Sequence, residues 1–370
     1  MKVVVIKNNL KEGLSAVERA AGENANLPIL KNVLLETEDN KLKLTATNLE
    51  IATSVYVLGK IIENGKVTVP LGIFSGLITN ISSERIDLEN KKNVLEIKTD
   101  NYQAAIHGIS ADEFPLIPKV KNLDEYIEIE AAILKEALNQ TIIASQFSEL
   151  RPELNSIFID FSLDNLKLVT TDSFRLAEKT LTGGQFQSNR QEPFNFLLPL
   201  RSGQEALRIL GDEGKVRLYN DGNQILFKTE RAEFFSRLME GTFPDYRAVV
   251  PQKFSAEMNI SRQELLNALK LAGIFSARTN EVKMNVLENK KAVGISSSDQ
   301  ALGENNYILP AKFRGDAKEM SFNWRYLSDG LKALTTDDVF LGFNEDNKPA
   351  LLKSPNDASY FYLLMPILKT

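Results

Sequence analysis

The chain has 370 residues, of which 43% are hydrophobic and 25% charged, ordinary values for a globular protein of two or three domains. It contains no cysteine, which excludes disulfides, thiolate nucleophiles and sulfur-ligated metals. The first apolar stretch ends at Lys7, so it is too short for a signal sequence or a membrane span. We therefore expect a cytoplasmic protein without a membrane segment.

The formal net charge of −5 argues against a simple nucleic-acid-binding module, which usually carries a basic surface. Counts of Lys+Arg against Asp+Glu are 14 against 15 over residues 1–119, 15 against 20 over 120–250, and 15 against 14 over 251–370. Because no third is strongly basic, a polyanionic partner would have to meet a local patch on an acidic body.

Each third opens with a short strand followed by an amphipathic helix. The strands are expected over residues 2–7, 126–130 and 254–260. The helices carry apolar stripes at Leu10, Leu14 and Val17, at Leu134, Leu138 and Ile142, and at Leu265, Leu269 and Ala272. Ser261 and Glu264 form a capping-box pattern that predicts where the last of these helices begins.

A second helix follows a hydrophobic strand in every third. Its apolar positions are Phe74, Leu77, Ile78 and Ile81, then Leu207 and Leu210, then Leu327, Leu331 and Leu334. Ser202 and Glu205 predict another capping box. The sequence thus predicts an α+β fold of three tandem copies, each with two helices packed on antiparallel sheets. The expected domains cover residues 1–119, 120–251 and 252–370.

Residues for catalysis are scarce. His107 is the only histidine, so histidine triads and multi-histidine metal sites are excluded, and we expect a structural or surface histidine in a strand. No glycine-rich phosphate-binding motif is present. Asp172 and Asp245 are the best candidate catalytic carboxylates, but their turn settings favour hydrogen bonds to the backbone. We predict no metal and no cofactor.

Four segments resemble the bacterial DNA polymerase III beta subunit family, the sliding clamps. They are residues 27–35 (LPILKNVLL), 171–177 (TDSFRLA, against T-D-G-H-R-L-A), 243–251 (FPDYRAVVP, against F-P-D-Y-R-x-V-x-P) and 363–367 (LLMPI). The resemblance covers all three thirds. It implies a non-catalytic processivity factor, a head-to-tail homodimeric ring of DNA-clamp domains. Duplex DNA would pass through the ring without being read, held by weak phosphate contacts.

The resemblance also implies that basic residues on the inward helices face the DNA. The candidate inward charges are Lys7, Lys11, Arg19, Arg201, Arg208, Arg262, Lys270, Arg325 and Lys332. Only Arg201 keeps a basic position typical of the family, and a solvated helix face explains each of these charges singly as well. Two segments differ from the family. Residues 23–26 (ENAN) stand where many members carry an Arg, and residues 71–73 (LGI) stand where basic residues are frequent.

A further implication is a groove between the second and third domains that binds short peptides of the replicative polymerase, the clamp loader and repair proteins. The matching residues are Leu154, Thr171, Ser173, Phe174, Arg175, Leu176, Pro244, Val249, Leu363, Met365, Pro366 and Ile367. Aliphatic walls, a flexible Met and an Arg suit peptide capture, although Leu176, Val249 and Leu363 are also candidates for the ordinary core. Ser173 and Phe174 replace Gly-His, and Leu368 replaces a basic residue, so Phe174 would narrow or cover the groove.

For ring closure, the family pairs a strand of the first domain with a helix of the third. Ile106, Ile274 and Phe275 match the apolar positions there, and an exposed Ile-Phe pair at a helix end calls for a partner. Two alternatives stay open. One is a monomeric peptide-binding scaffold unrelated to DNA, and the other is a hydrolase that uses Asp172.

Overall fold

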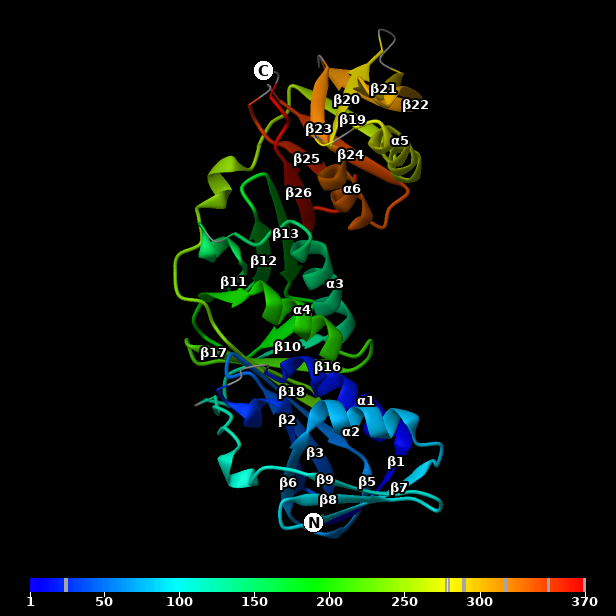
Figure 1. The fold of residues 1–370 in the computed structure, drawn as a ribbon. Coiled ribbons are helices and arrows are strands. Elements are labelled where there is room, and N and C mark those ends of the chain that lie inside the picture. The colour runs from blue at the N-terminus through cyan, green and yellow to red at the C-terminus, as the bar shows by residue number, and fades with distance from the viewer. Residues whose placement is uncertain are drawn as a thin grey trace. The chain divides into compact units, whose positions relative to one another are not determined.

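The computed structural model describes residues 1–22, 26–120, 122–148, 150–276, 278, 280–287, 291–315, 319–344 and 347–368. Residues 23–25, most of the segment that differs from the family, lie outside this description. The chain divides into two compact units. Unit 1 comprises Met1–Leu134, Gln185–Gln191 and Arg201–Leu238, and unit 2 comprises Lys135–Gly184, Glu192–Leu200 and Met239–Thr370. The middle third therefore contributes strands to both units (Figure 1).

Unit 1 holds two antiparallel sheets among the described residues. The five-stranded sheet has the order β5 (Gly59–Glu63), β1 (Lys2–Ile6), β7 (Arg85–Lys91), β8 (Val94–Lys98), β9 (Gln103–His107). The nine-stranded sheet has the order β14 (Phe186–Ser188), β10 (Ile127–Glu130), β16 (Lys215–Asn220), β17 (Gln224–Lys228), β18 (Ala232–Arg237), β4 (Ile51–Val57), β3 (Lys41–Thr47), β2 (Asn32–Glu38), β6 (Lys66–Pro70). The pairing of β18 with β4 joins the middle third to the first in one continuous sheet.

The helices of unit 1 cover these sheets. They are α1 (Lys7–Val17), α2 (Leu71–Asn80) and all but the first residue of α4 (Leu200–Ile209), with short turns η1 (Glu18–Ala20), η2 (Pro28–Lys31) and η3 (Ala111–Glu113). The stripe of Leu10, Leu14 and Val17 on α1 is buried, which confirms the predicted periodicity. Gly13 lets α1 approach the sheet, because a Cβ there would lie 2.6 Å from Val57.

The two predicted capping boxes had different outcomes. Ser261 is the N-cap of α5 (Arg262–Ile274), and its hydroxyl accepts a hydrogen bond from the Glu264 backbone N–H. The box at Ser202 is wrong, because α4 begins at Leu200 and Ser202 lies inside its first turn. The Ser202 hydroxyl is buried and instead accepts a hydrogen bond from Ser236 at 2.7 Å.

Unit 2 is built on one twelve-stranded antiparallel sheet among the described residues. Its order is β15 (Phe194–Pro199), β11 (Ser156–Phe161), β12 (Asn165–Thr171), β13 (Arg175–Thr182), β26 (Tyr360–Leu364), β25 (Ala350–Lys353), β24 (Asp338–Phe343), β19 (Ala256–Ser261), β22 (Gly303–Gly315), β21 (Ala292–Asp299), β20 (Glu281–Val286), β23 (Met320–Asn323). The pairing of β13 with β26, with Leu176 opposite Leu363, joins the middle third to the last.

Helices also pack on the sheet of unit 2. They are the larger part of α3 (Ala131–Ile142), α5 and α6 (Trp324–Lys332), with short turns η4 (Pro152–Leu154) and η5 (Tyr246–Val249). Two buried tyrosines of β26 hold helices at this sheet. The Tyr360 hydroxyl donates to the Gln140 carbonyl of α3, and the Tyr362 hydroxyl donates to the Tyr326 carbonyl of α6, each at 3.0 Å. The expected alternation of helices and antiparallel strands in each third is confirmed. In the described ranges, every helix is too short or too polar to cross a membrane.

Candidate functional site

A groove of about 330 Å³ lies in unit 2, beside the β13–β26 pairing. Ten of the predicted groove residues line it: Leu154, Thr171, Ser173, Phe174, Arg175, Leu176, Pro244, Val249, Leu363 and Met365. Leu154, Leu176 and Leu363 are almost completely buried and form its floor. Phe174 and Val249 are 61% and 52% exposed and stand at its rim. The groove is therefore an apolar trough with a firm floor and open edges.

One wall of the groove is a tight turn between β12 and β13. The Asp172 carboxylate accepts hydrogen bonds from the backbone N–H groups of Phe174 and Arg175, both at 3.0 Å, which confirms the predicted turn role of this aspartate. Ser173 has a φ of 76°, a conformation in the left-handed region. The carbonyl of Phe174 accepts a hydrogen bond from the backbone N–H of Met365 at 2.8 Å, so the turn and the segment after β26 are tied together.

Arg175 is the only fixed charge among the predicted groove residues. Its Nε lies 2.9 Å from the Asp172 carboxylate and its Nη1 lies 3.0 Å from Asp329 of α6. The guanidinium also stacks on the ring of Tyr326 at 4.2 Å. The side chain is only 9% exposed. Asp172 and Asp329 hold this guanidinium in place and offset most of its positive charge. Arg175 therefore forms a nearly neutral part of the groove wall.

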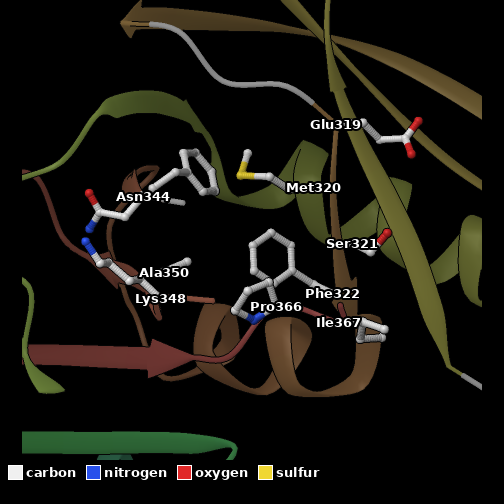
Figure 2. A pocket seen from close by; sticks show the side chains of 10 residues that line it. Glu319, Met320, Ser321, Phe322, Asn344, Lys348, Ala350, Pro366 and Ile367 are labelled. Atoms are coloured by element: carbon white, nitrogen blue, oxygen red, sulfur yellow. The ribbon is translucent and has the colours of Figure 1, made fainter. Parts of the chain in front are cut away.

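Pro366 and Ile367 were predicted to line this groove, but the structure places them elsewhere. They border a separate hollow of about 20 Å³, beside Met320 and Phe322 of β23 and Ala350 of β25 (Figure 2). The backbone N–H of Ile367 donates to the Ser321 carbonyl at 2.8 Å, which directs this segment along β23. The hollow has room for roughly one water molecule. Beyond Met365, the chain therefore leaves the groove.

Several groove residues were missed by the sequence-based prediction. They are Arg151, Asp245, Tyr246, Asn347, Pro349 and Leu364. Arg151 donates from Nη1 to the Ser173 hydroxyl at 3.3 Å across one end of the groove. Tyr246 is buried, and burial raises the pKa of its phenol. Tyr246 could have been predicted, because it lies in the FPDYRAVVP segment that resembles the family. Asn347 and Pro349 lie in no such segment.

The other residues considered for catalysis, Asp245 and His107, lie exposed at the surface. Asp245 is exposed before η5 and makes no side-chain capping bond there. His107 is exposed at the end of β9. In the described part of the chain, acidic and histidine side chains form no group of three or more that could hold a metal ion.

Lys7 does not extend freely from α1. Its Nζ donates a hydrogen bond to the carbonyl of Ile81, just beyond the end of α2. The side chain therefore satisfies a carbonyl at a helix C-terminus, where a cation is favourable.

Lys11 and Arg208 lie together in a polar cleft of about 630 Å³ in unit 1, between α1 and α4. Arg208 Nη1 donates to Glu205 Oε1 at 3.0 Å, and Arg19 Nη1 lies 3.9 Å from the same oxygen. Burial raises the pKa of Glu205, and the positive charge of Arg19 opposes that rise. The cleft thus contains three cations arranged near a shielded carboxylate.

The other predicted DNA-facing residues are spread over separate helices. Arg201 is exposed on α4 and Lys270 on α5, and Lys332 of α6 lies 3.6 Å from Asp329. Arg262 Nε donates to the Thr336 carbonyl, and Arg325 Nε donates to the side chain of Asn280. α2 carries no charged residue at all, so the first third offers cations from α1 and η1 but not from α2.

The predicted dimer residues fall into two kinds. Ile106 on β9 is 4% exposed and belongs to the core of unit 1, so its side chain is not at the surface. Ile274 at the end of α5 is 65% exposed, and the Phe275 ring lies beside Gly303. Two of the strand edges that are open among the described residues carry isoleucines: Ile106 on β9 and Ile308 on β22. β9 pairs only with β8, and residues 303–310 of β22 pair only with β21.

Comparison with known proteins agrees with this architecture of repeated α+β domains joined by continuous sheets. Family models of the DNA polymerase III beta subunit match the chain as N-terminal (residues 1–118), central (128–245) and C-terminal (247–368) domains. The beta sliding clamp of Synechococcus elongatus is 28% identical over 375 residues, and that of Bacillus subtilis is 26% identical over 380 residues. Each alignment covers 99% of both chains.

Solved structures give the same result. The crystal structure of the DNA polymerase sliding clamp from Bacillus subtilis superposes with a TM-score of 0.93 at 25% identity, covering 100% of both chains. The fold is therefore that of three tandem DNA-clamp domains. The chain belongs to the DNA polymerase III beta subunit family.

Proposed function

We propose that the chain is a DNA sliding clamp: a non-catalytic homodimeric ring that encircles duplex DNA and tethers the replicative polymerase to it. Family membership over nearly the whole chain carries this proposal. A ring holds DNA by topology, so it needs only weak, sequence-independent phosphate contacts, which agrees with an overall charge of −5 and cations on separate helices. Arg201, Lys270 and Lys332 would contribute such contacts.

The groove in unit 2 would bind short peptide segments of the polymerase, the clamp loader and repair proteins. The buried floor of Leu154, Leu176 and Leu363 suits apolar anchor residues, and the exposed rim residue Met365 can adapt its shape. The neutralised Arg175 favours peptides whose anchors are apolar over peptides whose anchors are acidic.

The ring would close between the open edges of β9 and of residues 303–310 in β22. β9 of one protomer would pair with residues 303–310 of β22 in its partner. This pairing would join the two sheets edge to edge across the interface. Ile274 and Ile308, 65% and 57% exposed, would become buried by this contact. Ile106 would contribute through the backbone of β9.

Three measurements test the function. Solution mass should correspond to a dimer, whereas a monomer would favour a scaffold unrelated to DNA. The protein should be retained on nicked circular DNA only after addition of a clamp loader and ATP, and linearising the DNA should release it. Retention that survives linearisation would refute the topological mechanism. A turnover screen in which Asp172→Asn abolished activity would instead favour a hydrolase.

The groove is tested with a peptide taken from the clamp-binding segment of the same organism's polymerase. Met365→Ala should weaken its affinity by about tenfold, because a side chain that contacts the peptide is lost. The dimer mass should stay the same. An unchanged affinity would place the peptide site elsewhere.

A further inference from the structure

Residues 240–250, which contain the FPDYR segment, are held on unit 2 by side chains. In the described part of the chain, the backbone–backbone hydrogen bonds of these residues stay within the segment, as from the Tyr246 N–H to the Pro244 carbonyl at 2.7 Å. Phe243 and Tyr246 are 8% and 5% exposed, whereas Pro244 and Val249 are exposed and line the groove. Two buried aromatic side chains therefore anchor a segment that supplies two exposed residues to the groove.

Both of these aromatic side chains pack on one ring of β11. The Phe158 ring stacks on Phe243, with 5.0 Å between the ring centres and 7° between the ring planes. Phe158 meets Tyr246 edge-on at 6.5 Å, and Phe243 meets Tyr246 edge-on at 6.2 Å. Stacked and edge-on contacts are the arrangements that aromatic pairs prefer, so the three rings form a stabilising aromatic triad.

β11 holds the segment at a second point, two residues beyond Phe158. Asp160 lies on the same face of the strand as Phe158, because side chains alternate along a strand. Its carboxylate accepts a hydrogen bond from Arg247 Nη2 at 2.7 Å, and the guanidinium also lies over the Tyr246 ring. In the described part of the chain, the lining of the groove includes neither Phe158 nor Asp160. Both residues therefore support the groove from outside it.

We propose that Phe158 is a positioning residue for peptide binding, with Asp160 in a smaller supporting role. The inference rests on the proposed peptide groove and deepens it. The aromatic triad keeps Pro244 and Val249 in the arrangement that a peptide meets, so less free energy is lost in ordering the segment when the peptide binds. The ion pair of Arg247 with Asp160 contributes less, because solvent weakens an exposed pair.

The test compares two phenylalanines of the same sheet in the full-length chain. Phe158→Leu keeps an apolar side chain and removes the stacking. Phe194→Leu is the matched control, because Phe194 is also partly buried, packs its ring against Phe161 and Phe196, and is not among the residues that line the groove in the described structure. We expect Phe158→Leu to weaken the affinity for the polymerase peptide about fivefold, and the control to change it by about twofold or less.

A spin label separates positioning from a general loss of stability. The chain contains no cysteine, so Val249→Cys offers a single site for a nitroxide on the segment. The electron paramagnetic resonance lines of the free protein should become narrower when Phe158→Leu is added and stay unchanged when Phe194→Leu is added, because Phe158 restrains the segment directly.

Asp160→Asn keeps the test decisive if Phe158→Leu does not fold. It keeps the shape of a partly exposed side chain, removes the charge that holds Arg247, and should weaken the peptide affinity about twofold. Peptide affinities of Phe158→Leu and Asp160→Asn equal to that of the unmodified protein would overturn the proposal, as would equal line widths for the two labelled phenylalanine variants. Failure of the unmodified protein to bind the peptide would instead refute the groove itself, so the two proposals can fail independently.

Discussion

The groove in unit 2 and the cleft in unit 1 both lie beside a joint between thirds of the chain but have opposite chemistry. Each lies where a continuous sheet joins the middle third to a neighbour, through β13 and β26 in unit 2 and through β4 and β18 in unit 1. The groove has an apolar floor and one cation enclosed by carboxylates. The cleft has exposed cations over one shielded carboxylate.

This difference shows how copies of one domain can carry sites of different chemistry. Sheet continuity fixes the joint in both units, and the side chains beside the joint are then free to diverge. In unit 2 the pairing of β13 with β26 is stabilised by burial of apolar side chains. Leu176 and Leu363 lie opposite each other in this pairing and belong to one apolar cluster. In unit 1 the neighbouring helix faces remain solvated. Substitutions should therefore affect stability in the first case and ionic-strength dependence in the second.

The largest effect is expected for Arg175→Ala. It would leave Asp172 without its partner in a nearly closed environment, and breaking a buried ion pair from one side costs about 3–5 kcal/mol. Equilibrium urea unfolding should show this loss. Arg247→Ala is the control, because Arg247 is 64% exposed and paired with Asp160, and such surface pairs contribute about 1 kcal/mol or less. Equal effects from the two variants would contradict the buried role of Arg175.

A smaller loss of stability is expected for Leu176→Ala. Leu176 is 4% exposed in the floor of the groove, and removal of such a side chain costs about 2–5 kcal/mol through lost burial and the cavity left behind. The peptide affinity should fall as well, because the floor would collapse or fill with water. If urea unfolding were unchanged while peptide affinity fell, Leu176 would be a pure contact residue and the floor would not be part of the core.

Local periodicity predicted the helices well. The stripes on α1, α5 and α6 are buried because an apolar face of a helix must pack on something, and the sheet is the nearest apolar surface. Strand alternation likewise accounts for the position of Ile106. On β9, Ala105 and His107 are exposed whereas Ile106 is buried, which is the ordinary alternation of a strand.

Long-range arrangements were beyond the sequence. Nothing local shows that β18 pairs with β4, that Lys7 reaches the carbonyl of Ile81, or that the chain leaves the groove after Met365. The box at Ser202 failed for a related reason, because its hydroxyl has a buried partner, Ser236, that is distant in the sequence. Ten groove residues were predicted only because family motifs carry this long-range information.

The rim of the groove should affect binding and leave stability unchanged. Phe174 is 61% exposed, so Phe174→Ala should change the free energy of unfolding by about 0.5 kcal/mol or less. We expect the affinity for the polymerase peptide to fall about five- to tenfold, since an aromatic rim residue contributes contact area to an interface. Isothermal titration calorimetry measures this directly. If Phe174→Ala instead bound the peptide more tightly, the phenyl ring of Phe174 would cover the groove in the free protein.

The smallest effect is expected for Lys332→Gln. Lys332 lies near Asp329, which also pairs with Arg175 of the groove. One oxygen of Asp329 lies 3.0 Å from Arg175 in the groove, and the other lies 3.6 Å from Lys332 on α6. The Lys332 side chain is 61% exposed, so Lys332→Gln should change stability by about 0.5 kcal/mol or less. The slope of log DNA affinity against log salt concentration should fall by about 1 or less, and peptide affinity should stay within about twofold of the unmodified protein, because Asp172 continues to hold Arg175. A larger change in peptide affinity would mean that Asp329 couples DNA contact to groove occupancy, and the division between an apolar groove and solvated cationic helices would no longer hold in unit 2.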